Sequence, residues 1–298
     1  MLAILGAIAV AGAGVAIGIT LHGGATPAAA GGKSSPTAAA PSSAAPSPTA
    51  APLPPAPTAN LIQAVTWIGQ QVGTSTVVAC DPQTCAALTA SGFPATEEAQ
   101  LGPNPQSLAG ASIVVVTPAL RTVMETSPIL GTYVAPTVLA SFGQVSIQPT
   151  DSAGAAAYQT ALAADMQARI QAGQQLVNSE NERASTTAQS ELAAGDVDPR
   201  LLLVLQALSS QVPIDILGFT DAGPGAGPGV PFREVALAAT DPASGLSSSG
   251  YLQVLARVVT THATFPAPHH AGPVTLPSGQ SVVEIVYTAP SPLGLLGP

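Results

Sequence analysis

Residues 198–219 read DPRLLLVLQALSSQVPIDILGF and carry a helix signal followed directly by a strand signal. Asp198 can accept hydrogen bonds from the free N–H groups at a helix start, and Pro199 suits the first turn because no N–H is needed there. The apolar run 201–208 predicts a helix, and the run 214–219 predicts a strand. The pair indicates a layered fold in which helices pack against a sheet.

The remainder of the segment 151–298 adds a long helix before this pair and a hairpin after it. The helix is predicted by an apolar stripe at helical spacing, formed by Tyr158, Leu162, Met166, Ile170 and Val177, with Asp165 and Arg169 off the stripe. Residues 251–261 predict another helix, and residues 232–238 a strand or a short helix. Two strands at 274–276 and 281–288 flank the turn 277–279. These elements predict an α+β domain over residues 151–298.

The preceding segment, residues 60–150, shows helices alternating with short apolar strands. Apolar residues at helical spacing predict a helix over residues 61–72, and strands are predicted at 76–79, 112–117 (SIVVVT) and 144–148. Asp81 and Pro82 begin a second helix that ends at Gly92. Continuous apolar strands between helices predict a small α/β layer with a largely parallel sheet.

The first 22 residues are almost entirely apolar and carry no charge. A run of about 20 apolar residues is long enough to cross a bilayer as a helix, so residues 1–22 are predicted to be a transmembrane anchor. The alternative is a cleaved signal peptide, with the small residues Ala28, Ala29 and Ala30 near a cleavage site. No Lys or Arg precedes the run, which allows for a start upstream of Met1. Either interpretation places the rest of the chain outside the cytoplasm.

Residues 23–59 are rich in Pro, Ala and Ser, and they contain no aromatic residue and one charge, at Lys33. Such a segment cannot bury enough apolar surface to offset its backbone entropy, so it predicts a disordered linker. The linker would hold the domains 60–150 and 151–298 away from the membrane surface.

The charge of the soluble part excludes one class of partner. Residues 60–298 contain six Arg and no Lys against sixteen carboxylates, a net charge of −10. Binding to nucleic acid relies on Lys and Arg replacing the counterions of the phosphates. Nucleic acid is therefore not an expected partner.

Cys80 and Cys85 are the only cysteines, and they flank the predicted turn between a strand and a helix. Two cysteines this close in an oxidising compartment usually form a disulfide. Two buried thiols, or a redox or metal-binding pair, are the alternatives. We expect the disulfide.

Residues 64–94 (AVTWIGQQVGTSTVVACDPQTCAALTASGFP) resemble the soluble extracytoplasmic modules of some bacterial membrane glycosyltransferases. The likeness lies in a Trp-Ile helix, a short strand, an acidic turn, a short helix and a Gly. It implies a fold and a compartment, because the transferase chemistry of those proteins belongs to their membrane part.

Residues 215–223 (DILGFTDAG) resemble the strand and loop of OmpA-like peptidoglycan-binding domains. The resemblance implies that Asp221 contacts the diaminopimelate of the peptide stem, with Arg233 as its partner. A Gly/Pro loop replaces the helix that carries the arginine in that family, and the companion Asn is missing. The two-segment layout is similar to membrane-anchored envelope proteins of high-GC Gram-positive bacteria.

Motifs that carry catalysis are absent from the sequence: it has no G-x-S-x-G, S-x-x-K or H-E-x-x-H. His262, His269 and His270 cluster near a Pro-rich loop. The pair His269-His270 could bind a metal with Asp221 or Asp241, but adjacent His residues in such a loop tend to point apart. The sequence predicts no catalytic residue, metal or cofactor.

Two functions remain open at the level of the sequence. The first is a membrane-tethered, single-pass envelope protein, or a secreted one, that binds or scaffolds an envelope protein or peptidoglycan. The second is a wall-associated enzyme or a degenerate relative of one. A cleft that gathers polar groups with shifted pKa values would favour the enzyme.

Overall fold

The computed structural model describes residues 58–101, 108, 110–238, 248–261 and 266–297. The described residues all belong to one compact unit, and so do all contacts below. The predicted anchor (1–22), nearly all of the predicted linker, His262 and Asp241 lie outside the described residues. None of the helices within the described ranges combines the length and apolarity that a membrane crossing needs.

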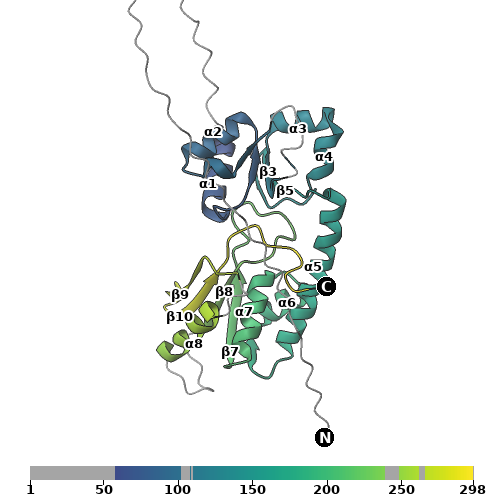
Figure 1. Ribbon diagram of the computed structural model, residues 1–298. Coiled ribbons are helices and arrows are strands. Elements are labelled where there is room, and N and C mark those ends of the chain that lie inside the picture. Colours follow the sequence, from purple (N-terminus) through teal and green to yellow (C-terminus); the bar gives the residue numbers. More distant parts are fainter. Residues whose placement is uncertain (1–57, 102–107, 109, 239–247, 262–265, 298) are drawn as a thin grey trace, which may run out of the picture. The chain divides into compact units, whose positions relative to one another are not determined.

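The first of two sheets is mixed. Its strand order is β2-β1-β3-β5-β4, and the strands are β1 (Val78–Cys80), β2 (Glu98–Gln100), β3 (Ile113–Val116), β4 (Ala140–Phe142) and β5 (Val145–Pro149). Figure 1 labels the neighbouring strands β3 and β5. β1 pairs in parallel with β2 and β3, but β5 is antiparallel to β3 and β4. The prediction of a largely parallel sheet is therefore wrong. A tight turn through Gly143, at φ +58°, joins β4 to β5 as a hairpin, which makes this pair antiparallel.

Helices cover both faces of this first sheet. α1 (Ala59–Gln71) precedes the first strand, and the helices between the strands are α2 (Pro82–Ala90), the 3₁₀ turn η1 (Ala95–Glu97), α3 (Pro118–Thr126) and α4 (Pro128–Tyr133). Ile113 and Val115 of β3 pack with α1 and α2, whereas Val114 and Val116 pack with α3 and α4. Because β3 is buried on both faces, its sequence is a continuous apolar run.

The second sheet has the order β6-β7-β8-β10-β9. Its strands are β6 (Glu182–Ala184), β7 (Ile214–Thr220), β8 (Glu234–Ala238), β9 (His270–Thr275) and β10 (Ser281–Val286). Among its described strand pairs, β6–β7 is the one that is parallel. The predicted strand after residue 213 and the C-terminal hairpin are confirmed, and the ambiguous segment 232–238 forms a strand. The chain is thus a mixed α/β protein with two mixed sheets.

Four helices accompany the second sheet: α5 (Ala155–Val177), α6 (Thr186–Ala194), α7 (Pro199–Ser209) and α8 (Ser248–Thr261) (Figure 1). Leu201, Leu202 and Leu205 of α7 are fully buried, and they pack with the inward residues of β7, β8 and β10 in one core. The side chains on the opposite face of these strands, such as Asp215, are half-buried. The second sheet is therefore helix-covered on one face.

The buried face of α5 differs from the prediction. Met166 and Val177 of the predicted stripe are 42% and 37% exposed, whereas Asp165 and Arg169 are each 3% exposed. The two charged side chains form an ion pair one turn apart, with Arg169 Nε 2.9 Å from Asp165 Oδ2. Asp165 Oδ1 also accepts a hydrogen bond from the N–H of Gly294. Because the two charges neutralise each other, the pair can be buried. The buried face of α5 therefore includes these two residues, which the prediction had placed off the apolar stripe.

Candidate functional site

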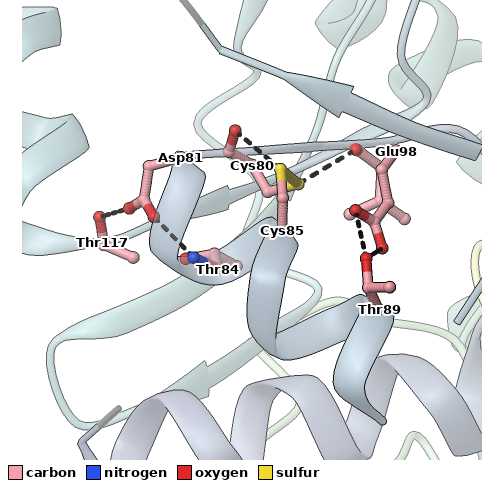
Figure 2. Close-up of a disulfide and its surroundings, with 8 residues drawn as sticks. Cys80, Asp81, Thr84, Cys85, Thr89, Glu98 and Thr117 are labelled. Atoms are coloured by element: carbon pink, nitrogen blue, oxygen red, sulfur yellow. Dashed lines mark hydrogen bonds between the residues drawn. A yellow bond between two sulfur atoms is a disulfide. The ribbon is translucent and has the colours of Figure 1, made fainter. Parts of the chain in front are cut away.

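Cys80 and Cys85 form a disulfide, as predicted (Figure 2). Cys80 ends β1 and Cys85 lies in the first turn of α2, with Cα atoms 5.4 Å apart. Asp81 holds the turn between them: Oδ1 accepts from the Thr84 N–H (2.8 Å) and Oδ2 from the Thr117 hydroxyl (2.6 Å). The bridge therefore sits at a strand-to-helix junction that is also fixed by a helix cap.

Possible metal ligands gather at one place in the part of the chain that the structure describes. Cys80, Cys85 and Glu98 bring their ligand atoms within 4.8 Å of one another. A metal requires free thiolates, and both sulfurs are already bonded to each other, so this group is not a metal site in the oxidised protein. His269 and His270 are exposed, and His270 begins the edge strand β9.

Asp221 and Arg233, predicted as a binding pair, lie side by side at neighbouring strand ends. Thr220, the last residue of β7, pairs with Glu234, the first of β8, so the residues just beyond them meet. The N–H of Arg233 donates to the carbonyl of Asp221 at 3.3 Å, and Arg233 Nη2 lies 3.8 Å from Asp221 Oδ1. That distance is an ion-pair contact beyond hydrogen-bond reach.

The Asp221 carboxylate is engaged locally instead. Its Oδ1 accepts a hydrogen bond of 2.6 Å from the N–H of Gly223, and the backbone of Asp221 is left-handed at φ 56°. Asp tolerates this conformation better than most residues because its short polar side chain can bond to nearby backbone. With 31% of its side chain exposed, Asp221 remains reachable from solvent.

Arg233 is 1% exposed, yet most of its donors have no acceptor. Nη1 donates to Gln71 Oε1 at 3.0 Å, while Nε and Nη2 donate to none of the described residues. Burial lowers the pKa of Arg233, and the nearby carboxylates of Asp221 and Asp198 oppose that shift. A buried donor without an acceptor is rare in folded proteins, and side chains with a shifted pKa cluster at functional sites.

Trp67 provides a second unpaired donor at the same place. Its side chain is 3% exposed, and its Nε1–H has no acceptor among the described residues. A methyl group added to Gly223 would lie 2.6 Å from Arg233 Nη2 and 3.0 Å from Trp67 Nε1. The indole and guanidinium donors therefore flank one glycine, although Trp67 belongs to α1 and Arg233 precedes β8.

Backbone hydrogen bonds between segments that flank the two sheets hold these residues together. The N–H of Ala289 donates to the carbonyl of Gln71 at 2.6 Å, and the N–H of Ser141 donates to the carbonyl of Gly225 at 2.7 Å. The loop 221–231 and the segment after β10 thus pack against α1 and β4. We call this contact region, between α1 and β4 on one side and the loop 221–231 and residues 289–293 on the other, the seam.

The seam contains a small inner cavity of about 40 Å³ lined in part by Trp67, Arg233, Tyr158 and Leu162. A larger, open pocket of about 450 Å³ shares Tyr158 and residues 290, 291 and 293 with this cavity, so the two adjoin. Sequence reasoning found Asp221 and Arg233 but missed Trp67 and Gln71. Nothing in the sequence distinguished Gln71, and the signal for Trp67 was that it is the single tryptophan of the chain.

Glu182 on the edge strand β6 predicts a pH effect on stability. Neither carboxylate oxygen has a hydrogen-bond partner among the described residues, and burial raises the pKa of Glu182 to about 7. Folding then favours the protonated form, so this contribution to stability is complete below about pH 4.5 and is lost as the pH rises to about 7. After discounting for solvent screening, Glu182→Gln should gain about 1 kcal/mol over wild type at pH 8, a Tm rise of about 2–4 °C.

The measurement is the Tm of wild type and Glu182→Gln between pH 5 and pH 8. The exposed neighbour Glu180 provides the control substitution Glu180→Gln. Parallel Tm curves for Glu182→Gln and wild type across this range would contradict the prediction.

Comparison with known proteins found no matching family model, no matching curated protein and no matching solved structure.

Proposed function

We propose that this chain is an extracytoplasmic binding protein of the cell envelope, tethered to the membrane through residues 1–22, and that Asp221 and Arg233 bind the peptide stem of peptidoglycan. The observation that carries the proposal is the acid–base pair at the seam, with Arg233 Nη2 3.8 Å from Asp221 Oδ1. Neither side chain satisfies the other fully, which leaves both available to a ligand.

The pair complements a ligand that carries an amine and a carboxylate close together. The partly exposed Asp221 can receive an ammonium group, while the unpaired edge of Arg233 can receive a carboxylate. Amino-acid centres such as the free end of diaminopimelate have both groups on one carbon. The Gly- and Pro-rich loop 221–231 adds backbone N–H groups that lie outside the ladder of the sheet.

Two further properties support the envelope as the place of action. Disulfides persist in oxidising compartments, and Cys80–Cys85 is one. A net charge of −10 over residues 60–298 disfavours binding to nucleic acid and to anionic lipid surfaces. Both are compatible with a domain held away from the membrane by the segment 23–59.

The test is sedimentation of the full-length chain, in detergent micelles, with insoluble peptidoglycan. We expect wild type to sediment and Asp221→Asn to bind roughly tenfold more weakly, the equivalent of one charge-assisted hydrogen bond. Asp215→Asn, the same chemical change at the other end of β7, should bind as wild type does.

Two outcomes would oppose the proposal in different ways. Wild type that stays in the supernatant would remove peptidoglycan as the ligand. Equal sedimentation of wild type and Asp221→Asn would show that Asp221 is not part of the binding site.

A further inference from the structure

The Nε and Nη2 donors of Arg233 lack an acceptor among the described residues, whereas the same two donors of Arg200 are paired with a carboxylate. In Arg200, Nε donates to Asp198 Oδ1 at 2.9 Å and Nη2 donates to Asp198 Oδ2 at 2.7 Å. The same two nitrogens are the ones that lack an acceptor in Arg233. Two parallel N–H donors on a rigid guanidinium match the two oxygens of a carboxylate, so the comparison identifies the group that would complete Arg233.

Asp221 does not fill this edge. Its Oδ1 is 3.8 Å from Nη2 and is bonded to the N–H of Gly223. The third unpaired donor, Trp67 Nε1, lies across Gly223 from the guanidinium. An indole N–H can only donate, so all three unpaired groups call for an acceptor.

The inner cavity beside these donors has room for a small group. Its volume of about 40 Å³ exceeds the roughly 10–15 Å³ that one water molecule needs. Its walls combine the two donor side chains and the Asp165–Arg169 ion pair with apolar groups such as Leu139 and Leu162. The adjoining open pocket of about 450 Å³ can accommodate the remainder of a larger molecule.

We propose that the inner cavity of the seam is a carboxylate-binding site, in which Arg233 Nε and Nη2 hold the two oxygens and Trp67 Nε1 donates to one of them. The proposal deepens the function proposed above and rests on it for the biological ligand, but the site itself can be tested with a free carboxylate. Because Trp67 belongs to α1 and Arg233 precedes β8, a bound carboxylate links the two sides of the seam. Binding should therefore stabilise the folded protein.

The probe is sodium acetate, added to the full-length chain in micelles while the fluorescence of Trp67 is recorded. Trp67 is the only tryptophan, so the signal comes from the site alone. We expect a saturable change with a Kd on the order of 1 mM, because acetate has few atoms with which to bind. Acetamide, which has the same shape but no charge, and sodium chloride at equal ionic strength should produce no saturable change.

Two variants test the contributions of Arg233 and Trp67 to acetate binding separately. Arg233→Lys keeps the charge but loses the two-pronged geometry, and we expect it to weaken acetate binding at least tenfold. Trp67→Phe removes the indole N–H, so its acetate binding is followed as the acetate-induced rise in Tm, which should be smaller than in wild type. Circular dichroism establishes that each variant is folded, and Arg121→Lys, at an exposed arginine, should respond as wild type does.

The results discriminate between the two proposals. A wild-type response that acetamide or chloride reproduces, or that survives unchanged in folded Arg233→Lys, would overturn the carboxylate site. Sedimentation with peptidoglycan but no acetate response would also overturn the site while leaving the proposed function standing. An acetate response lost in Arg233→Lys, without sedimentation, would support the site and reject peptidoglycan as its ligand.

Discussion

Replacement of Asp198 by Ala should lower the free energy of unfolding by about 3–5 kcal/mol. Asp198 is fully buried, caps α7 through the N–H of Arg200 (2.9 Å), and holds the Arg200 guanidinium with both oxygens. Arg200 also donates to the carbonyl of Thr288 at 2.7 Å and lies 4.8 Å above the ring of Tyr287. Without the carboxylate, a buried arginine loses its counter-charge while its other contacts keep it in place.

Urea denaturation of the full-length chain measures this loss, and Asp198→Asn provides the matched comparison. Asn can still cap the helix but cannot neutralise Arg200, so the Asn variant should fall between wild type and the Ala variant. The exposed carboxylate Glu125 provides the background substitution Glu125→Ala, which should change stability by less than about 0.5 kcal/mol. A loss below about 1 kcal/mol in Asp198→Ala would contradict the assigned role of the ion pair.

Replacement of Gly173 by Ala should destabilise the protein by about 1–3 kcal/mol, even though Ala is the better helix former. Gly173 lies where α5 crosses α6. An added methyl group would overlap the carbonyl oxygen of Leu192 and lie 2.8 Å from the carbonyl carbon. These atoms are backbone, so the two helices would have to separate and lose packing in the core of the second sheet.

Gly69→Ala is the control for this substitution, and its expected effect on the free energy of unfolding has the opposite sign. Gly69 lies in the interior of α1, is exposed, and has no neighbouring atom within 4 Å of an added methyl group. Gly69→Ala should therefore raise the free energy of unfolding by about 0.4–1 kcal/mol. If Gly173→Ala also raised stability in the same urea experiment, the close crossing of α5 and α6 would be wrong.

Local chemistry explains which elements the sequence predicted well. The cap at Asp198, the apolar runs of α7 and β7, and the disulfide each depend on residues close together in the chain. The same holds for Asp221 and Arg233, which meet because the strands that flank them are antiparallel neighbours. Twelve positions separate these two residues, and β-pairing closes that gap.

The errors arose where long-range packing decides the outcome. Helical spacing placed Asp165 and Arg169 off the apolar stripe of α5, but both are buried because each neutralises the other within the helix. The direction of β5 depends on the hairpin at Gly143, for which the flanking residues give a weak signal. Trp67 meets Arg233 across 166 positions of sequence, and no local pattern links an indole in an amphipathic helix to an arginine before a strand.

The most direct measurement of the central claim, that the seam binds a carboxylate, is the NMR signal of the Trp67 indole N–H. In full-length chain labelled with ¹⁵N-tryptophan, the single Trp gives one indole resonance. We predict that this resonance moves downfield in a saturable way as acetate is added, because Nε1–H acquires an acceptor, and that acetamide leaves it in place. A resonance that acetate does not move, or that moves equally in Arg233→Lys, would contradict the account.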